Sequence, residues 1–274
     1  MFRRHKDFFI TLFLVLFSAV LAMSNIKNIG LAWDEAIYFG WVIRYAQWFD
    51  LLFKLGLGEA LTEAAINHFW VGANQHPPLV ILLGACSFSL LADIIGPVTS
   101  LRLVNIMFFA LSAGLVFRLG LISCNRRAGL LAALILIGLP RIFGHSLIYG
   151  MDMPMAFMWL LTVFCFIKGL ENKYWSLLTG FCLGLALLTK INAVLLPIVF
   201  LLWPLFVIVL RYFCRERNRP GQVTSGVGAG RLIDILKQAK WNFLSIFFVS
   251  PLVMFCLWPR LWYHPVALIK AYFL

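Results

Sequence analysis

The chain has 274 residues, of which 62% are hydrophobic and 12% are charged, with a mean hydropathy of +0.93. Soluble domains carry roughly a quarter charged residues, so this composition excludes a soluble globule and a disordered chain. The net charge is +12. Most basic residues flank apolar runs, which indicates orientation in a bilayer and argues against nucleic-acid binding. The six cysteines form no C-x-x-C pair, so neither a disulfide framework nor a thiolate metal site is expected.

Apolar runs recur along the chain and predict membrane helices. The first follows the basic N-terminus MFRRHKD and is typical of a retained signal anchor, because no convincing small-residue cleavage site follows it. The positive-inside rule places the N-terminus and the later basic turns in the cytoplasm. The basic turns all face the cytoplasm only if run 77–95 does not cross the membrane, which leaves seven predicted spans. The eight runs are 8–23, 77–95, 102–121, 127–141, 153–169, 174–189, 192–211 and 241–258.

A long outer loop, 24–101, is predicted between the first two spans. It contains one amphipathic helix that begins at Trp33-Asp34-Glu35 and repeats apolar and aromatic residues every three to four positions. Its second helix is run 77–95, half-inserted in the membrane and ended by Gly96-Pro97.

The fold class predicted is an all-α polytopic membrane protein, with residues 1–274 forming one transmembrane module. The polar, glycine-containing stretch 212–240 is predicted to be a cytoplasmic linker. A further helix is expected to start near Pro265 and to continue into a longer protein.

Polar side chains gather in the segments placed outside the membrane. Charged groups at membrane depth are costly, so an acid–base cluster there is a functional hypothesis. Each residue also has an ordinary structural role. Asp34 and Asp152 are suited to helix N-caps, Lys190 to snorkelling and Arg260 to an aromatic belt. The outer residues of interest are Asp34, Glu35, His76, Arg141, His145, Asp152, Lys190, Arg260 and His264.

Several short motifs, in this order, resemble the GT-C class of membrane glycosyltransferases. The similarity is to family 39, which includes protein O-mannosyltransferases and bacterial aminoarabinose transferases, and it spans nearly the whole chain as an N-terminal portion. It implies about seven spans with juxtamembrane helices in the first outer loop. The chain departs from the pattern at His264, where related bacterial proteins have an acid, and it lacks the family's C-terminal part. The motifs are WDEAIYFG from Trp33, HPPL from His76, SLRL around Arg102, YGMDMP around Asp152, GLALLTK ending at Lys190, and WPRLW around Arg260.

The resemblance implies transfer of a sugar from a polyprenyl-phosphate donor to an acceptor on the outer face. Asp34 is the expected general base of an inverting reaction, with Glu35 and Asp152 as further acids. It leaves open whether Asp34 and Asp152 share a divalent cation such as Mg²⁺, Mn²⁺ or Zn²⁺. The residues expected to hold the donor phosphate by charge-assisted hydrogen bonds are Lys190, His76, Arg102, Arg141 and Arg260.

The compact loops favour a bacterial inner membrane, with the N-terminus cytoplasmic and the active site periplasmic. The sugar is not indicated, and the acceptor could be a lipid, a glycan or a protein. The alternatives are a membrane transporter or flippase and a non-catalytic scaffold that binds a lipid-linked sugar. Transporters place charges at the membrane midplane, often within inverted repeats. Here the charges lie in outer loops and no repeat is found, which favours the enzyme.

Overall fold

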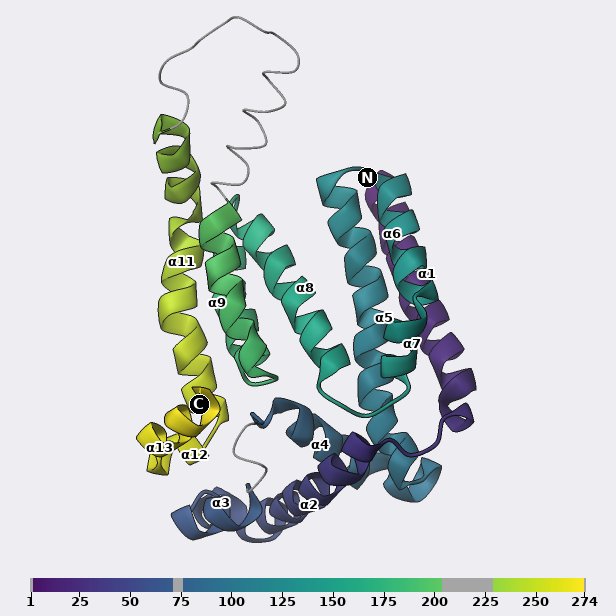
Figure 1. Cartoon of the computed structure of the whole chain (residues 1–274), viewed down its shortest axis with the longest axis vertical. Coiled ribbons are helices and arrows are strands. Elements are labelled where there is room, and N and C mark those ends of the chain that lie inside the picture. Colours follow the sequence, from purple (N-terminus) through teal and green to yellow (C-terminus); the bar gives the residue numbers. More distant parts are fainter. Residues whose placement is uncertain (1, 71–75, 204–228, 274) are drawn as a thin grey trace, which may run out of the picture.

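The computed structural model describes residues 2–70, 76–203 and 229–273, and all their regular secondary structure is helical (Figure 1). Four helices in this part of the chain are long and apolar enough to cross a membrane. They confirm the prediction of an all-α polytopic membrane protein. These helices are α1 (Phe2–Asn25), α5 (Pro97–Ser123), α8 (Asp152–Gly169) and α11 (Ala229–Leu257).

The other predicted spans are shorter or bent. Run 127–141 forms two helices, α6 (Arg126–Gly138) and α7 (Pro140–Ser146), that meet at an angle of 66°. Pro140 supplies no N–H to continue α6, and the residue before a proline favours extended backbone. If α6 and α7 together make one broken span, the described residues contain five spans, fewer than the seven predicted.

The remaining two runs are short where they are described. Helix α9 (Lys173–Leu187) has 15 residues, fewer than a perpendicular crossing requires. Run 192–211 begins as η2 (Ile191–Val194) and stays helical to residue 203. Its end lies outside the described residues.

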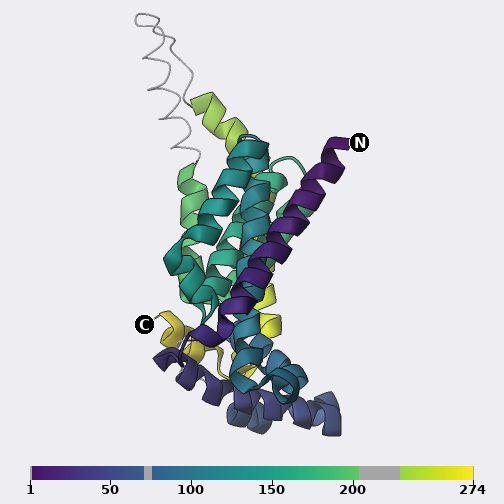
Figure 2. The ribbon, with the colours of Figure 1, turned by 90° about the vertical axis from the view of Figure 1, so that its right-hand side faces the viewer.

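The helices form two groups, joined where α5 packs against α8. Helices α1, α5, α6 and α7 make one group, in which α1 crosses at a tilt (Figures 1 and 2). Helices α8, α9 and α11 make the other. Glycines allow α9 and α11 to approach closely, since a methyl group at Gly180 would overlap Ser245 and one at Gly184 would overlap Val253. Small residues are typical of such contacts between membrane helices.

The predicted outer-loop helices lie crosswise at the end of the bundle far from the N-terminus (Figure 1). Helix α2 (Trp33–Ala60) begins at Trp33 as expected and packs against α4 (Leu79–Ile95), which is shorter than the four spanning candidates. Helix α4 ends at Ile95. The next residue, Gly96, has a φ of 88° that suits glycine, and Pro97 opens α5. The predicted end of run 77–95 is therefore confirmed.

The C-terminal segments complete this end of the molecule. Helices α3 (Glu63–Phe69) and α12 (Arg260–Tyr263) contact one another. Helix α13 (Pro265–Phe273) starts where the sequence predicts it. The predicted linker 212–240 differs from the structure. Residues up to 228 lie outside the described part. Residues 229–240 form the first turns of α11, because apolar residues recur at helical spacing between the charged ones.

Candidate functional site

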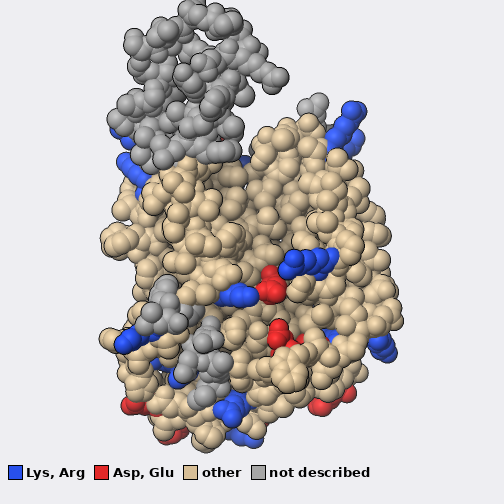
Figure 3. All heavy atoms as spheres, viewed as in Figure 1, with Lys and Arg blue, Asp and Glu red and all other residues tan. Residues whose placement is uncertain are grey.

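A cavity of about 240 Å³ lies where the start of α2 meets the chain between α7 and α8 and the turn after α9. Acidic and basic side chains gather near the centre of the corresponding face (Figure 3). The volume is below that of pockets for drug-sized ligands, so it suits one small polar ring. The polar side chains that line the cavity are Asp34, Tyr38, Asn105, His145, Asp152 and Lys190.

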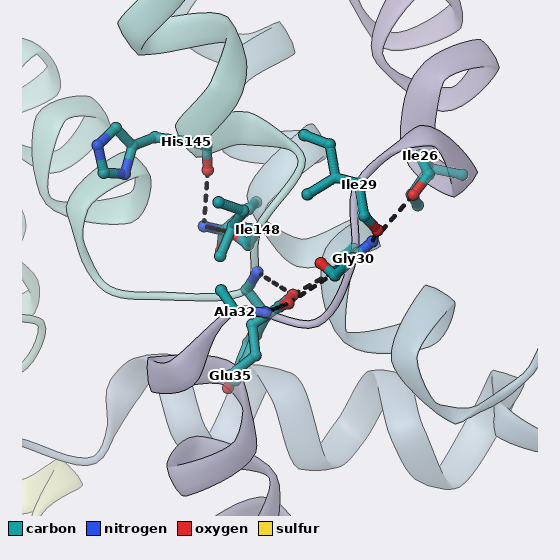
Figure 4. Close-up of polar contacts among 10 residues, drawn as sticks. Ile26, Ile29, Gly30, Ala32, Glu35, His145 and Ile148 are labelled. Atoms are coloured by element: carbon teal, nitrogen blue, oxygen red, sulfur yellow. Dashed lines mark hydrogen bonds and ion pairs between the residues drawn. The ribbon is translucent and has the colours of Figure 1, made fainter.

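The carboxylate of Glu35 and the guanidinium of Arg102 form a buried ion pair beside this cavity. Arg102 Nε donates to Glu35 Oε1 at 2.8 Å, and Nη2 donates to Oε2 at 2.7 Å, the bidentate geometry that distinguishes arginine from lysine. The other three N–H groups donate to the carbonyls of Ile26, Ile29 and Gly30 (Figure 4). The two side chains are 4% and 2% exposed, and every guanidinium N–H already has an acceptor.

Glu35 also joins three chain segments. Its Oε2 accepts the Ala32 N–H at 2.9 Å, which satisfies an otherwise unpaired donor at the start of α2. Its Oε1 accepts the Tyr149 N–H at 2.8 Å. Burial raises the pKa of Glu35, but the hydrogen bonds from Arg102, Ala32 and Tyr149 outweigh burial and lower the pKa below its usual value. One ionised carboxylate thus holds together the segments that carry the two acids of the cavity.

A backbone hydrogen bond ties the start of α4 to the end of α9. Leu79 is the first residue of α4, so its N–H has no acceptor within that helix. It donates to the carbonyl of Leu188, the C-cap residue of α9, at 3.0 Å. Because His76 lies just before α4 and Lys190 just after α9, this bond links the HPPL and GLALLTK motifs.

Lys190 and Asp152 form an ion pair in the cavity wall. Lys190 Nζ donates to Asp152 Oδ1 at 2.9 Å, and Asp152 Oδ2 lies 3.8 Å from His145 Nδ1. Asp152 is the first residue of α8, where a carboxylate suits the helix dipole. Lys190 stands in extended backbone between α9 and η2. The side chains remain 32% and 59% exposed, so a ligand can reach the pair.

Asp34 is exposed in the same cavity and has no ion-pair or hydrogen-bond partner among the described residues. Tyr38 lies one helical turn later, on the same face of α2. Burial raises the pKa of Tyr38, and the nearby charges of Asp34 and Asp152 raise it further. The phenol therefore stays protonated and offers a hydrogen-bond donor near both acids.

His76 lies beside the cavity, against aromatic rings. Its ring centroid is 5.8 Å from that of Tyr38 and 5.7 Å from that of Trp41. Burial lowers the pKa of His76, and Lys190 lowers it further against the opposing effect of Asp34. His76 Nδ1 has no hydrogen-bond partner among the described residues. A neutral imidazole is thus favoured at this position.

The structure brings Asp34, Asp152 and Lys190 into one cavity, as the sequence predicts. It corrects the roles of Glu35 and Arg102, which were expected to act as an acid and as a phosphate ligand. The two are bound to one another, nearly fully buried, and neither offers a free group to a substrate. The sequence pattern could not show this, because it contains no sign that two residues in separate segments meet.

The remaining two predicted phosphate ligands lie outside the cavity lining. Arg141 is on α7, close enough to act electrostatically on Asp152. Arg260 is on α12, close enough to act on Tyr45 of α2.

A divalent cation does not fit the two acids well. The part of the chain that the structure describes contains no group of three His, Cys, Asp or Glu side chains placed to hold a metal ion. Asp152 Oδ1 already accepts a hydrogen bond from the Lys190 ammonium, and hard cations prefer several oxygen ligands together.

Sequence reasoning missed three residues around the cavity. Tyr38 and Tyr149 were noted only as members of motifs, although their aromatic rings pack together at 6.2 Å. Asn105 was not considered. Its position three residues after Arg102, on the same face of a helix, was the one available signal.

These features together define a polytopic membrane protein with a polar site at one end of its helix bundle. The family model described as dolichyl-phosphate-mannose-protein mannosyltransferase matches residues 75–218, just over half of the chain. The chain belongs to this family and is a membrane glycosyltransferase of the GT-C type. His76, Asp152 and Lys190 lie within the matched range, whereas Asp34 and Arg260 lie outside it. No curated protein matches the chain.

Proposed function

We propose that the protein transfers a sugar from a polyprenyl-phosphate donor to an acceptor, with inversion at the anomeric carbon. The observation that carries this proposal is the single cavity in which the unpaired carboxylate of Asp34 accompanies the Asp152–Lys190 ion pair. In such a site the carboxylate of Asp34 can accept a proton, and the ammonium group of Lys190 can bind a leaving phosphate. Membership of a mannosyltransferase family makes mannose the first donor sugar to test.

Asp34 acts as the general base. The acceptor hydroxyl or amine attacks the anomeric carbon, a new bond forms there, and the bond from that carbon to the phosphate oxygen breaks. The acceptor proton passes to Asp34, and the electron pair leaves with the phosphate. A single displacement of this kind inverts the anomeric centre. Asp34 suits this role because no described cation neutralises its carboxylate.

Lys190 holds the leaving phosphate, and Asp152 positions Lys190. An ammonium group has three donors, so Lys190 can keep its bond to Asp152 while binding a phosphate oxygen. Charge placed in advance stabilises the developing phosphate charge without reorganisation in the transition state. Arg141, His76 and Arg260 stay candidates for further contacts to the donor phosphate or its lipid.

The site faces the side of the membrane opposite the N-terminus. Helix α2, whose first turns line the cavity, lies at the far end of the bundle from the basic N-terminal segment (Figure 1). The positive-inside rule puts that basic segment in the cytoplasm. We place the protein in a bacterial inner membrane with its site in the periplasm.

The test uses the full chain, purified and reconstituted in lipid nanodiscs. Radiolabelled polyprenyl-phosphate mannose is supplied with membrane extracts as the source of acceptors, and both donor binding and label transfer are measured. Asp34→Asn should retain donor binding and lose transfer by about 100-fold or more. Gln47→Glu, on the exposed face of α2 away from the cavity, is the matched control and should transfer normally.

The other outcomes favour different functions. Saturable donor binding with no transfer by the unaltered chain would favour a scaffold. Finding neither binding nor transfer would overturn the lipid-donor proposal. Movement of the donor across the bilayer of sealed proteoliposomes would favour a flippase.

A further inference from the structure

Asn105 is a polar residue in the interior of α5 that the proposed reaction does not use. Its side chain is 1% exposed, yet it lines the cavity. Its Nδ2 donates to the carbonyl of Ile148 at 2.7 Å and to that of His145 at 3.4 Å (Figure 4). The residue thus connects α5 with the loop that leads to Asp152.

These two bonds settle the orientation of the amide group. A carboxamide has two N–H donors on nitrogen and an oxygen that only accepts. Since both donors face carbonyl oxygens, the flipped arrangement would set oxygen against oxygen. The Oδ1 atom of Asn105 is therefore an acceptor, and it is buried without a hydrogen-bond partner among the described residues.

A buried acceptor without a partner is uncommon in folded proteins and calls for an explanation. Asn105 lines the cavity, so a ligand that enters it lies beside this amide and can donate the missing hydrogen bond after a small shift of the side chain. An uncharged acceptor is well suited to a hydroxyl group. Lys190, which the proposed function assigns to the donor phosphate, lines the same cavity of about 240 Å³. The hydroxyl-bearing group next to that phosphate is the donor sugar ring, since the other neighbour is the apolar prenyl chain.

We propose that Asn105 Oδ1 accepts a hydrogen bond from one ring hydroxyl of the donor sugar and thereby selects sugars that carry this hydroxyl. The inference rests on the proposed function. It makes Asn105 a binding residue that contributes to sugar specificity. A site built to bond a hydroxyl discriminates strongly against the analogue that lacks it, because the buried acceptor is then left unpaired.

Asn242 provides a matched control on another helix. It is a fully buried asparagine of α11 whose Nδ2 donates to the Phe166 carbonyl at 3.0 Å. Its Oδ1 lies 3.4 Å from Thr179 Oγ1, whose single hydroxyl proton also faces the Trp175 carbonyl at 2.9 Å. Asn242 does not line the cavity. Asn242→Ala should affect stability without changing sugar preference.

The experiment measures binding, so it needs no acceptor. Short-chain prenyl-phosphate mannose and its monodeoxy derivatives are titrated against the full chain in nanodiscs by calorimetry. The unaltered protein should bind one monodeoxy derivative about ten-fold or more weakly than the parent. In Asn105→Ala the parent and that derivative should bind equally, whereas Asn242→Ala should keep the full discrimination.

The outcomes separate this inference from the proposed function. If the unaltered protein binds the parent but treats every monodeoxy derivative alike, the Asn105 assignment is overturned and the proposed function stands. The same holds if Asn105→Ala keeps the discrimination. Failure of the unaltered protein to bind the parent overturns both. Should Asn105→Ala not fold, the deoxy series on the unaltered protein still decides whether any hydroxyl is selected, and Asn105→Leu, a side chain of similar size without an acceptor, takes its place.

Discussion

Glu35 and Arg102 form a bidentate ion pair in which every N–H group of the guanidinium has an acceptor. The pair connects the start of α2 with α5, and the Tyr149 N–H adds the loop before α8. Charges this deeply buried are costly unless fully compensated. Here five hydrogen bonds compensate the buried charge of the arginine. The same ion pair holds the backbone next to Asp34 in place.

Breaking this pair should destabilise the protein strongly. We expect Arg102→Ala to lower the free energy of unfolding by about 3–5 kcal/mol, because it leaves the Glu35 carboxylate buried without its main partner. Thermal unfolding in detergent measures the effect. Arg126→Ala removes an ion pair with Asp7 in which Arg126 is 40% exposed. This variant should lower the free energy of unfolding far less. Equal losses in the two variants would contradict the structural role of the Glu35–Arg102 pair.

Acid should weaken the same contact. The pKa of Glu35 is lowered from its ordinary 4.5 in the folded protein. Its contribution to stability is therefore fully present above the unfolded-state pKa and is lost as the pH falls through the folded-state pKa. The stability difference between the unaltered protein and Glu35→Gln should shrink as the pH is lowered below about 4.5. A difference that stays constant over that range, measured by thermal unfolding, would contradict an ionised Glu35.

Close packing of α9 against α11 gives a third prediction. A methyl group at Gly180 would overlap Ser245, so Gly180→Ala should cost about 1–3 kcal/mol through overpacking. Gly40, within α2, has nothing within 4 Å of the added methyl. Gly40→Ala should be neutral or slightly stabilising, because alanine favours helix. Thermal unfolding of both variants provides the test, and a stable Gly180→Ala would show that the two helices do not approach this closely.

Lys190 should matter more for donor binding than Asp34 does. Lys190→Met removes the cation that faces the leaving phosphate, and a charged hydrogen bond is worth about 1.5–3 kcal/mol. We expect donor binding to weaken by about 10- to 100-fold, measured by titration with short-chain prenyl-phosphate mannose. Lys173→Met, a lysine at the start of α9 that does not line the cavity, is the control. Unchanged binding in Lys190→Met would remove Lys190 from the phosphate site.

The sequence was informative about elements and less so about contacts. Composition and apolar runs predicted the all-helical membrane fold, and the charge pattern set run 77–95 apart from the spans. Asp34, Asp152 and Lys190 were found because each lies in a short motif, and the motifs follow one another in an order that resembles the GT-C class. The shortness of α9 lowers the span count among the described residues below seven, since hydropathy alone does not measure how long a helix is.

The Glu35–Arg102 pair and Asn105 could not be assigned from the sequence. Both depend on which segments meet around the cavity, and one sequence gives no contact information. A lone arginine at the start of a predicted span looks the same whether it binds a phosphate or a buried carboxylate. The unpaired oxygen of Asn105 is visible only once the carbonyls of His145 and Ile148 are placed around its nitrogen.

The role of Asp34 is tested most directly by comparing Asp34→Asn with Asp152→Asn in one assay of donor binding and label transfer. We expect Asp34→Asn to bind the donor normally and to transfer about 100-fold or more slowly. We expect Asp152→Asn to weaken donor binding as well, because Lys190 loses its positioning carboxylate. Normal transfer by Asp34→Asn, measured beside an active unaltered protein, would contradict the assignment of Asp34 as the base.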